Sequence, residues 1–416
     1  MAGQSDNRAR ISGDQLRPAT EQLIFNPFDP EFRKDPYPVY DWLLAGDRVR
    51  VSPLGLWIFP RYEDCTAILR DKRFSADSRN AEGFVAPGSE EEARLFDENR
   101  PFLFLDPPDH RRLRGLVSKA FTPHAVEAMR PRIEEIVDDL LDAAREKGEV
   151  DLIADLAYPL PVTVISEMLG VPKEDSDRFR KWSDDLARSL DPDFAVTDTS
   201  ARDEAASAFR DYFTDLVAKR RSDPGGDLLS SLIAAEEEGD RLNEAELLTT
   251  CILLLVAGHE TTVNLIANGV LALLRNPDQC AFLASRLDLI TTAVEEMLRY
   301  DPPVQFTGRI ALEDVEIAGE VVPKGKVALT LLAAANRDPD QFDEPDHFDI
   351  TRDPNPHLAF GMGIHHCLGA PLARLEGQVA IAGLVDRFPG MQLATEDVTY
   401  KENVVLRGLA ELRVRL

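Results

Sequence analysis

The sequence has few basic residues for its length. Lys and Arg total 47 against 74 Asp and Glu, so the formal net charge is 47 − 74 = −27. The phosphates of nucleic acids and anionic membrane surfaces repel such a chain, and we expect neither as a partner. Hydrophobic residues still make up 44% of the chain, which is enough for a large core.

Cysteine is also scarce. The four cysteines, Cys65, Cys251, Cys280 and Cys367, are far apart in the sequence, and no two form a Cys-x-x-Cys motif. This spacing argues against a disulfide framework and agrees with a reducing compartment. We therefore expect a cytoplasmic protein.

The chain lacks an apolar segment near its N-terminus. Residues 1–20 are polar, which excludes a signal peptide or membrane anchor there and predicts a flexible arm. No repeat, low-complexity tract or linker divides the rest, so residues 21–416 are predicted to form a single domain. The longest apolar region, Leu247–Leu274, contains His259 and Glu260 at its middle and is predicted to be a buried helix.

The spacing of apolar residues predicts a mainly helical protein with small sheets. Helices are expected at 36–45, 62–70, 109–120, 123–146, 175–190, 201–221, 227–238, 243–275, 277–286, 289–300 and 370–388. Strands are expected at 49–51, 56–59, 304–310, 315–318 and 327–331, and in the tail after residue 391. The irregular stretch 75–104 is long enough to suggest a functional loop.

A cysteine loop directly precedes one of these helices. Residues 360–369 read FGMGIHHCLG. Gly361 and Gly363 permit positive φ, and Pro371 is allowed in the first turn of the following helix. The N-terminus of a helix favours the thiolate form of Cys367, and a thiolate ligand on heme iron promotes O–O cleavage.

Two other interpretations of this loop stay open at this point. A lone cysteine before a helix is often an inert core residue. Four of the seven histidines lie in the 21 residues that end at Cys367, so a zinc site is also conceivable. The candidate zinc ligands are His347, His357, His365, His366 and Cys367. Zinc, however, does not require the phenylalanine and glycine spacing of the loop.

A second polar motif interrupts the apolar helix predicted at 243–275. Residues 257–262 read AGHETT. A glycine in a helix interior costs about 1 kcal/mol relative to alanine, and a buried acid costs more unless it is paired. One explanation is a hydroxyl that bonds a helix carbonyl and opens a groove beside an acid that relays protons. A polar pair that merely kinks a core helix is the alternative.

The pattern F-G-x-G-x-H-x-C-x-G resembles the heme-binding loop of cytochromes P450, and AGHETT resembles the oxygen-activation motif of that family. The resemblance implies that Cys367 is the axial ligand of heme iron, that Glu260 supplies protons and that Thr261 stabilises the activated oxygen. The residues expected to contact heme are His110, Arg114, Ala257, Arg309, Phe360, Gly361, His365, Cys367 and Gly369.

Glu296 and Arg299 share one helical face at a spacing of three. Alone, this spacing is a weak signal, because most such pairs are solvated surface contacts. In its context, before Asp-Pro-Pro and a strand, it resembles the E-x-x-R helix of the same family. The resemblance implies a buried, structural ion network, and Arg352 is the candidate third member.

The resemblance covers the chain from about residue 36 to its end. It implies the mainly α, prism-shaped cytochrome P450 fold and a monooxygenase that contains heme b. The enzyme would use O₂ and electrons from NAD(P)H, delivered through a ferredoxin reductase and a ferredoxin. We expect a monomer. Rival functions are a heme-thiolate enzyme that uses peroxide or needs no O₂, and a heme sensor.

The resemblance also indicates the substrate pocket, and the charge pattern of this acidic chain suggests a docking surface. The pocket would be lined by Phe84, Val85, Ala257, Val304 and Phe306, which suits a mid-sized or large apolar natural product such as a macrolide, polyketide or terpenoid. The predicted helix 109–120 carries three further basic residues, which form a candidate docking patch for an acidic electron donor. They are Arg111, Arg112 and Lys119.

Overall fold

The computed structural model describes residues 25–84, 97, 100–172, 175–187, 200–237, 242–395 and 397–416. As predicted, the protein is mainly helical with small sheets. The longer helices are α2 (Tyr37–Ala45), α3 (Tyr62–Arg70), α5 (Asp109–Val117), α7 (Arg130–Lys147), α8 (Pro159–Met168), α9 (Ser176–Ala187), α10 (Ser200–Ser222), α11 (Leu228–Glu237), α12 (Glu244–Arg275), α13 (Pro277–Ser285), α14 (Ile290–Tyr300) and α16 (Ala370–Arg387). The shorter ones are α1 (Pro30–Lys34), α6 (Pro123–Glu127) and α15 (Leu332–Ala335).

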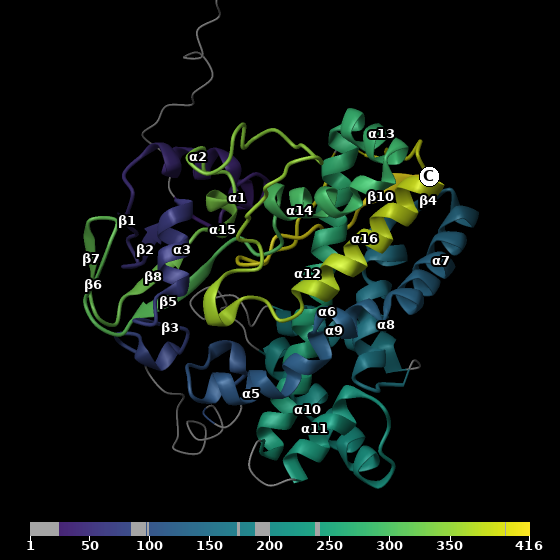
Figure 1. Ribbon diagram of the computed structural model, residues 1–416, viewed down its shortest axis with the longest axis horizontal. Coiled ribbons are helices and arrows are strands. Elements are labelled where there is room, and N and C mark those ends of the chain that lie inside the picture. The colour runs from purple at the N-terminus through teal and green to yellow at the C-terminus, as the bar shows by residue number, and fades with distance from the viewer. Residues whose placement is uncertain are drawn as a thin grey trace, which may run out of the picture.

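The largest sheet lies beside the N-terminal helices, at the left of Figure 1. Its strand order is β1 (Arg50–Val51), β2 (Trp57–Phe59), β8 (Val327–Thr330), β5 (Thr307–Ala311) and β3 (Phe74–Ser75). The β2–β8 pair is parallel and the other pairs are antiparallel. The smaller sheets are β4 (Glu149–Asp151), β10 (Arg413–Arg415) and β9 (Gln392–Leu393), and the hairpin of β6 (Val315–Ile317) and β7 (Glu320–Val322).

Helix α12 runs through the middle of the helical part and lies against α8 and α16 (Figure 1). Its start is fixed by a capping box, in which the Asn243 side chain accepts from the Glu246 backbone N–H and the Glu246 side chain accepts from the Asn243 backbone N–H. The helix is long and apolar enough to cross a membrane, but 72% of its most apolar window is buried inside the protein. It is therefore packed as a core helix.

The boundaries differ from the expected ones where proline decides them. The expected helix 123–146 is two helices, α6 and α7, because Pro131 in the first turn of α7 has no N–H to continue the preceding helix. Helix α8 was not predicted; Pro159 and Pro161 occupy its first turn, where proline is tolerated. Val304 forms an isolated bridge with Leu406, so β5 begins later than expected, at Thr307.

Candidate active site

The cysteine loop, residues 360–369, has the strained backbone that its glycines predicted. Gly361 and Gly363 have φ of 64° and 75°, in the left-handed region. A Cβ on Gly363 would also lie 2.2 Å from the carbonyl oxygen of Leu69, so no other residue fits there. The Cys367 N–H donates to the Phe360 carbonyl at 2.9 Å and closes the loop.

Cys367 differs from the other cysteines in its accessibility. It is exposed, whereas Cys65, Cys251 and Cys280 are buried. Desolvation by the surrounding loop raises the pKa of the Cys367 thiol, while the backbone N–H groups of Gly369 and Ala370 and the charge of Arg114 lower it. These two amides belong to the start of α16, where Pro371 lies in the first turn as predicted. The sulfur thus lies at a helix N-terminus, accessible to a ligand.

Four nitrogen-bearing side chains gather beside the loop. The rings of His110 (α5) and His365 lie 4.2 Å apart, and the Nε2 atom of each is buried without a hydrogen-bond partner. Burial and the charges of Arg309, His110 and Arg114 lower the pKa of His365 to about 3. Burial also lowers the pKa of Arg309 to about 10, against the opposing effect of Asp106. Such a cluster is stabilised by an anion that accepts hydrogen bonds.

These residues fit heme. Its iron requires an accessible axial donor, and its two propionates require buried cationic or N–H donors. Cys367 is such a donor, and the unpartnered Nε2 atoms of His110 and His365 are what propionate oxygens would satisfy. Arg114 is already tied to the loop, because it donates to the His366 carbonyl at 2.6 Å. Arg374 covers the ring of Phe360, with 4.5 Å from the guanidinium carbon to the ring centroid.

The zinc interpretation of the same histidines is not supported. Within the described residues, no group of three or more His, Cys, Asp or Glu side chains is arranged to hold a metal ion. His357 bonds Glu295 at 3.1 Å, and the ring of His365 lies against that of His110. The histidines are close in sequence but have separate partners.

The AGHETT segment, residues 257–262, lies on an unbroken stretch of α12. The Thr261 hydroxyl donates to the Ala257 carbonyl at 3.0 Å, which is the predicted bond to a helix carbonyl. Ala257, Gly258 and Thr261 are partly accessible, although most of the helix around them is buried. Ala257 and Thr261 share one face of α12 at i and i+4, whereas Gly258 lies against Ile165 of α8.

Glu260 is buried and bonds a residue that the sequence analysis missed. Its Oε1 accepts from Lys401 Nζ at 2.7 Å, and its Oε2 is buried without a hydrogen-bond partner. Lys401 is 141 residues away in the C-terminal segment. No local pattern around Lys401 signals this contact.

A second buried acid, Glu376 on α16, was also missed. Burial raises its pKa to about 8, against the lowering effect of a hydrogen bond with the Thr262 side chain. Its Oε2 has no partner. The sequence did contain a signal, because Glu376 lies among the apolar residues of the predicted helix 370–388. An acid in such a place is either exposed at the surface or buried for a functional reason.

Glu296 and Arg299 on α14 are fully buried and form an ion pair of 2.7 Å. Arg352 approaches Glu296 at 3.2 Å, and Asn355 donates to it at 3.1 Å. Arg299 also donates to three backbone carbonyls between residues 336 and 347. The network therefore fastens α14 to the segment that leads into the cysteine loop.

The residues predicted to line the substrate pocket are spread over several elements. Ala257 on α12 is partly accessible, and Phe84 and Val304 are partly buried in loops. Phe306 is buried, with its ring centroid 5.9 Å from that of Phe25, in the core cluster beneath α1 and α2. Its described contacts are core contacts. Val85 lies outside the described residues.

Comparison with known proteins identifies the family. The cytochrome P450 family model matches residues 74–283 and 283–406. Cytochrome P450 monooxygenase PikC of Streptomyces venezuelae is 46% identical over 396 residues, covering 92% of each chain. The 6-deoxyerythronolide B hydroxylase of Saccharopolyspora erythraea is 40% identical, covering 93% of this chain and 98% of that protein.

A solved structure agrees over nearly the whole chain. The ligand-free crystal structure of Mycobacterium smegmatis CYP164A2 superposes with a TM-score of 0.86 at 46% identity, covering 94% of this chain and 98% of that one. The chain therefore belongs to the cytochrome P450 family, as a heme-dependent monooxygenase that uses O₂ and electrons from NAD(P)H supplied by redox partners.

Proposed function

We propose that Cys367 is the axial ligand of heme iron, and that His110, Arg114, Arg309 and His365 bind the propionates. The observation that carries this assignment is the exposed cysteine at the start of α16 beside two buried, unpartnered imidazole nitrogens. Phe360, Gly361 and Gly369 shape the loop around the sulfur, and Ala257 on α12 would contact the heme. Heme b would supply the oxygen chemistry.

The protein residues would then control protons and water. Glu260 holds a carboxylate inside α12, one residue before the Thr261 hydroxyl, which is kept in place by its bond to the Ala257 carbonyl. We assign Glu260 to proton supply and Thr261 to orienting the reacting oxygen through its hydroxyl. The ion network of Glu296, Arg299 and Arg352 has no chemical role and holds the cysteine loop in position.

The function is tested by the spectrum of the reduced protein with carbon monoxide. A thiolate ligand gives a strongly red-shifted Soret band, and we expect Cys367→His to lose it. Cys280→Ala, which changes a buried cysteine on α13, should keep the band. A histidine-type band in the unmodified protein, or a thiolate band that survives in Cys367→His, would overturn the assignment.

The proposed substrate is a mid-sized or large apolar natural product, with a macrolide lactone as the leading class. The relative named 6-deoxyerythronolide B hydroxylase supports this class. Phe84, Val304 and Ala257 are apolar and partly accessible, and we place Val85 with them. Because Phe306 is buried in the core, we propose that it does not contact the substrate and instead packs behind the segment that contains Val304. A spin-state screen of macrolides, other polyketides and terpenoids tests the proposal, and a response to polar compounds alone would contradict it.

The electron donor is proposed to be a ferredoxin, itself reduced by a ferredoxin reductase. Arg111 and Lys119 are exposed and can face an acidic partner. Arg112 is not available in the same way, because it forms an ion pair of 2.6 Å with Glu246 and a bond to Asp109. The docking patch is therefore reduced to two residues, and Arg112 instead ties α5 to the start of α12.

Reversing Arg111 and Lys119 to glutamate should slow reduction by ferredoxin several-fold and weaken its salt dependence, because rim charges act mainly on association. Stopped-flow reduction at several salt concentrations measures this effect. Arg145→Glu is the matched control, because it reverses an exposed charge on α7, away from α5 (Figure 1). Equal reduction rates for the double variant and the control would exclude the patch.

We also propose that the protein is a cytoplasmic monomer and that residues 21–416 form one domain; the spacing of the cysteines supports a reducing compartment. The arm predicted at 1–20 lies outside the described residues.

A further inference from the structure

A stripe of polar residues on α12 begins at the proposed proton donor. Glu260, Asn264 and Asn268 are buried and lie at i, i+4 and i+8, on one face of the largely apolar helix α12. Buried polar side chains are retained only when something packs against them that satisfies their hydrogen bonds or constrains them. Glu260 and Asn268 bond another segment of the chain, whereas both polar atoms of the Asn264 side chain are buried without a hydrogen-bond partner.

That segment is the C-terminal hairpin, residues 399–410. Its two sides are joined by bonds from the Lys401 N–H to the Gly408 carbonyl at 2.9 Å and from the Ala410 N–H to the Thr399 carbonyl at 2.7 Å. Asn268 donates to the Arg407 carbonyl at 3.1 Å. A Cβ on Gly408 would lie 2.0 Å from the Asn264 side-chain oxygen, so the hairpin approaches α12 as closely as glycine allows. The third contact is the ion pair of Lys401 with Glu260.

The same hairpin is joined to the segment proposed to contact substrate. Val304 and Leu406 form an antiparallel bridge, and the Gln305 N–H donates to the Val405 carbonyl at 3.0 Å. The Arg407 N–H donates to the Pro303 carbonyl at 2.7 Å. A displacement of residues 303–305 would therefore be transmitted to the hairpin through the two backbone hydrogen bonds that form this bridge.

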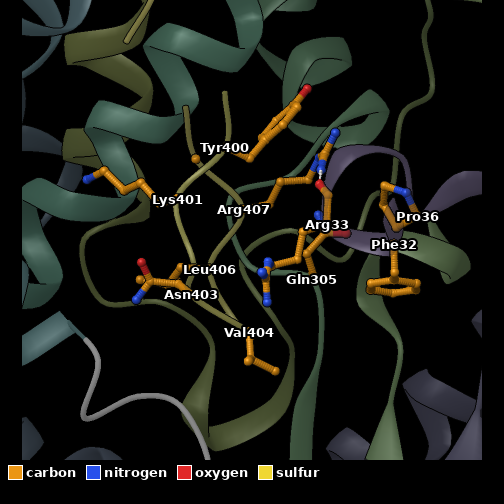
Figure 2. A pocket seen from close by; sticks show the side chains of 11 residues that line it. Phe32, Arg33, Pro36, Gln305, Tyr400, Lys401, Asn403, Val404, Leu406 and Arg407 are labelled. Atoms are coloured by element: carbon orange, nitrogen blue, oxygen red, sulfur yellow. Dashed lines mark hydrogen bonds between the residues drawn. The ribbon is translucent and has the colours of Figure 1, made fainter. Parts of the chain in front are cut away.

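A small surface cavity lies between the hairpin and α1. It is lined by the hairpin together with Gln305 and residues of α1, including Phe32 and Arg33. Figure 2 shows the Lys401 side chain turned away from Phe32, on the opposite side of the hairpin strand from α1. Arg407 pairs with Asp301 at the end of α14 at 2.8 Å, and it donates to the carbonyls of Arg33 and Lys34 on α1. The hairpin thus packs against α12 on one side. On its other side, at this cavity, it is incompletely packed against α1.

We propose that Lys401 is a positioning residue for the monooxygenase reaction: it holds the Glu260 carboxylate in α12, and its hairpin couples this ion pair to the substrate segment 303–305. This inference rests on the proposed role of Glu260. Lys401 neutralises the charge of the buried Glu260 carboxylate through Oε1. The Oε2 atom has no hydrogen-bond partner and is left to accept a proton from water. Lys401 belongs to the hairpin and not to α12. Movement of the hairpin would therefore shift the position of the Glu260 carboxylate without altering the backbone of the helix.

The first test is an infrared spectrum. In Lys401→Met the buried Glu260 has no counter-charge, and such a group becomes neutral. Glu376 already gives one carbonyl stretch of a protonated carboxyl group at neutral pH. In Lys401→Met we expect an additional stretch of this kind, absent from the unmodified protein and from Lys401→Arg. The additional stretch should disappear in the double variant Lys401→Met/Glu260→Gln. Lys147→Met is the control, because it removes a comparable lysine–carboxylate pair of 2.6 Å at the surface.

The second test is the share of NAD(P)H oxidation that ends as hydrogen peroxide, measured with the compound that gives the largest spin-state shift. Lys401→Met should raise this share several-fold, Lys401→Arg should restore most of the coupling, and Lys147→Met should change nothing. If Lys401→Met leaves both the infrared spectrum and the peroxide share unchanged while Glu260→Gln raises the share, the role of Lys401 is wrong. If Glu260→Gln itself has no effect, the proposed relay fails, and this inference with it.

Discussion

Replacing Arg299 by leucine is expected to lower the free energy of unfolding by about 3–5 kcal/mol, the usual cost of breaking a buried ion pair on one side. Arg299 is fully buried and forms the 2.7 Å pair with Glu296. It also donates to the carbonyls of Asn336, Pro345 and His347 at 2.7–3.1 Å. The leucine variant would leave a buried carboxylate and these carbonyls without their main donor.

The effect should extend to heme retention, because the network fastens the segment before the cysteine loop. Glu296 accepts from the Asp349 backbone N–H at 3.0 Å and from Arg352 and Asn355. We expect the purified variant to contain much less heme per chain. Urea denaturation followed by circular dichroism measures stability, and the heme absorbance per protein measures retention.

Arg286→Leu is the matched control for this prediction. Its pair with Asp288 has a similar distance of 2.7 Å but lies at the surface, so its loss should not be measurable. The double variant Glu296→Leu/Arg299→Leu should recover part of the stability, because it removes the uncompensated charge. Equal losses for Arg299→Leu and Arg286→Leu would show that the buried network does not support the fold.

Glu376→Gln is expected to remove a pH dependence of stability between about pH 4.5 and 8. The folded carboxyl keeps its proton up to a pKa of about 8, whereas the unfolded one titrates near the ordinary value of 4.5. Above pH 4.5 the unfolded state therefore binds fewer protons than the folded state, so the contribution of Glu376 to stability falls as the pH rises to about 8. A shift of this size corresponds to roughly 3–5 kcal/mol.

The glutamine variant carries the neutral form at every pH. Its stability relative to the unmodified protein should therefore increase steadily from pH 5 to pH 8, by several kcal/mol. Urea denaturation of both proteins across this range measures the difference. Glu134→Gln, which changes an exposed acid on α7, should give a constant difference. A constant difference for Glu376→Gln as well would mean that Glu376 is ionised in the folded protein.

Much of the site was readable from the sequence because the features are local. Positive φ at Gly361 and Gly363, proline in the first turn of α16 and the spacing of Glu296 and Arg299 each depend on a few consecutive residues. Backbone sterics and helix periodicity fix such features wherever the segment lies. The bond from Thr261 to the Ala257 carbonyl belongs to the same kind.

Boundaries were predicted less well where two local preferences compete. The apolar spacing of residues 123–146 suits one helix, but Pro131 starts a second one. Residues 304–306 have the composition of a strand, yet their partner is the hairpin near Leu406, so the strand proper starts at Thr307. In both cases the pattern predicted the type of element correctly and its boundary wrongly.

The sequence by itself determined the helical architecture, the cysteine loop and the motif on α12. Only the tertiary structure decided the partners: Lys401 for Glu260, Glu246 for Arg112, Thr262 for Glu376 and His110 for His365. Each of these contacts joins side chains more than 100 residues apart. The energy of such a contact depends on burial and geometry that arise only when the helices pack, and no sequence period encodes it.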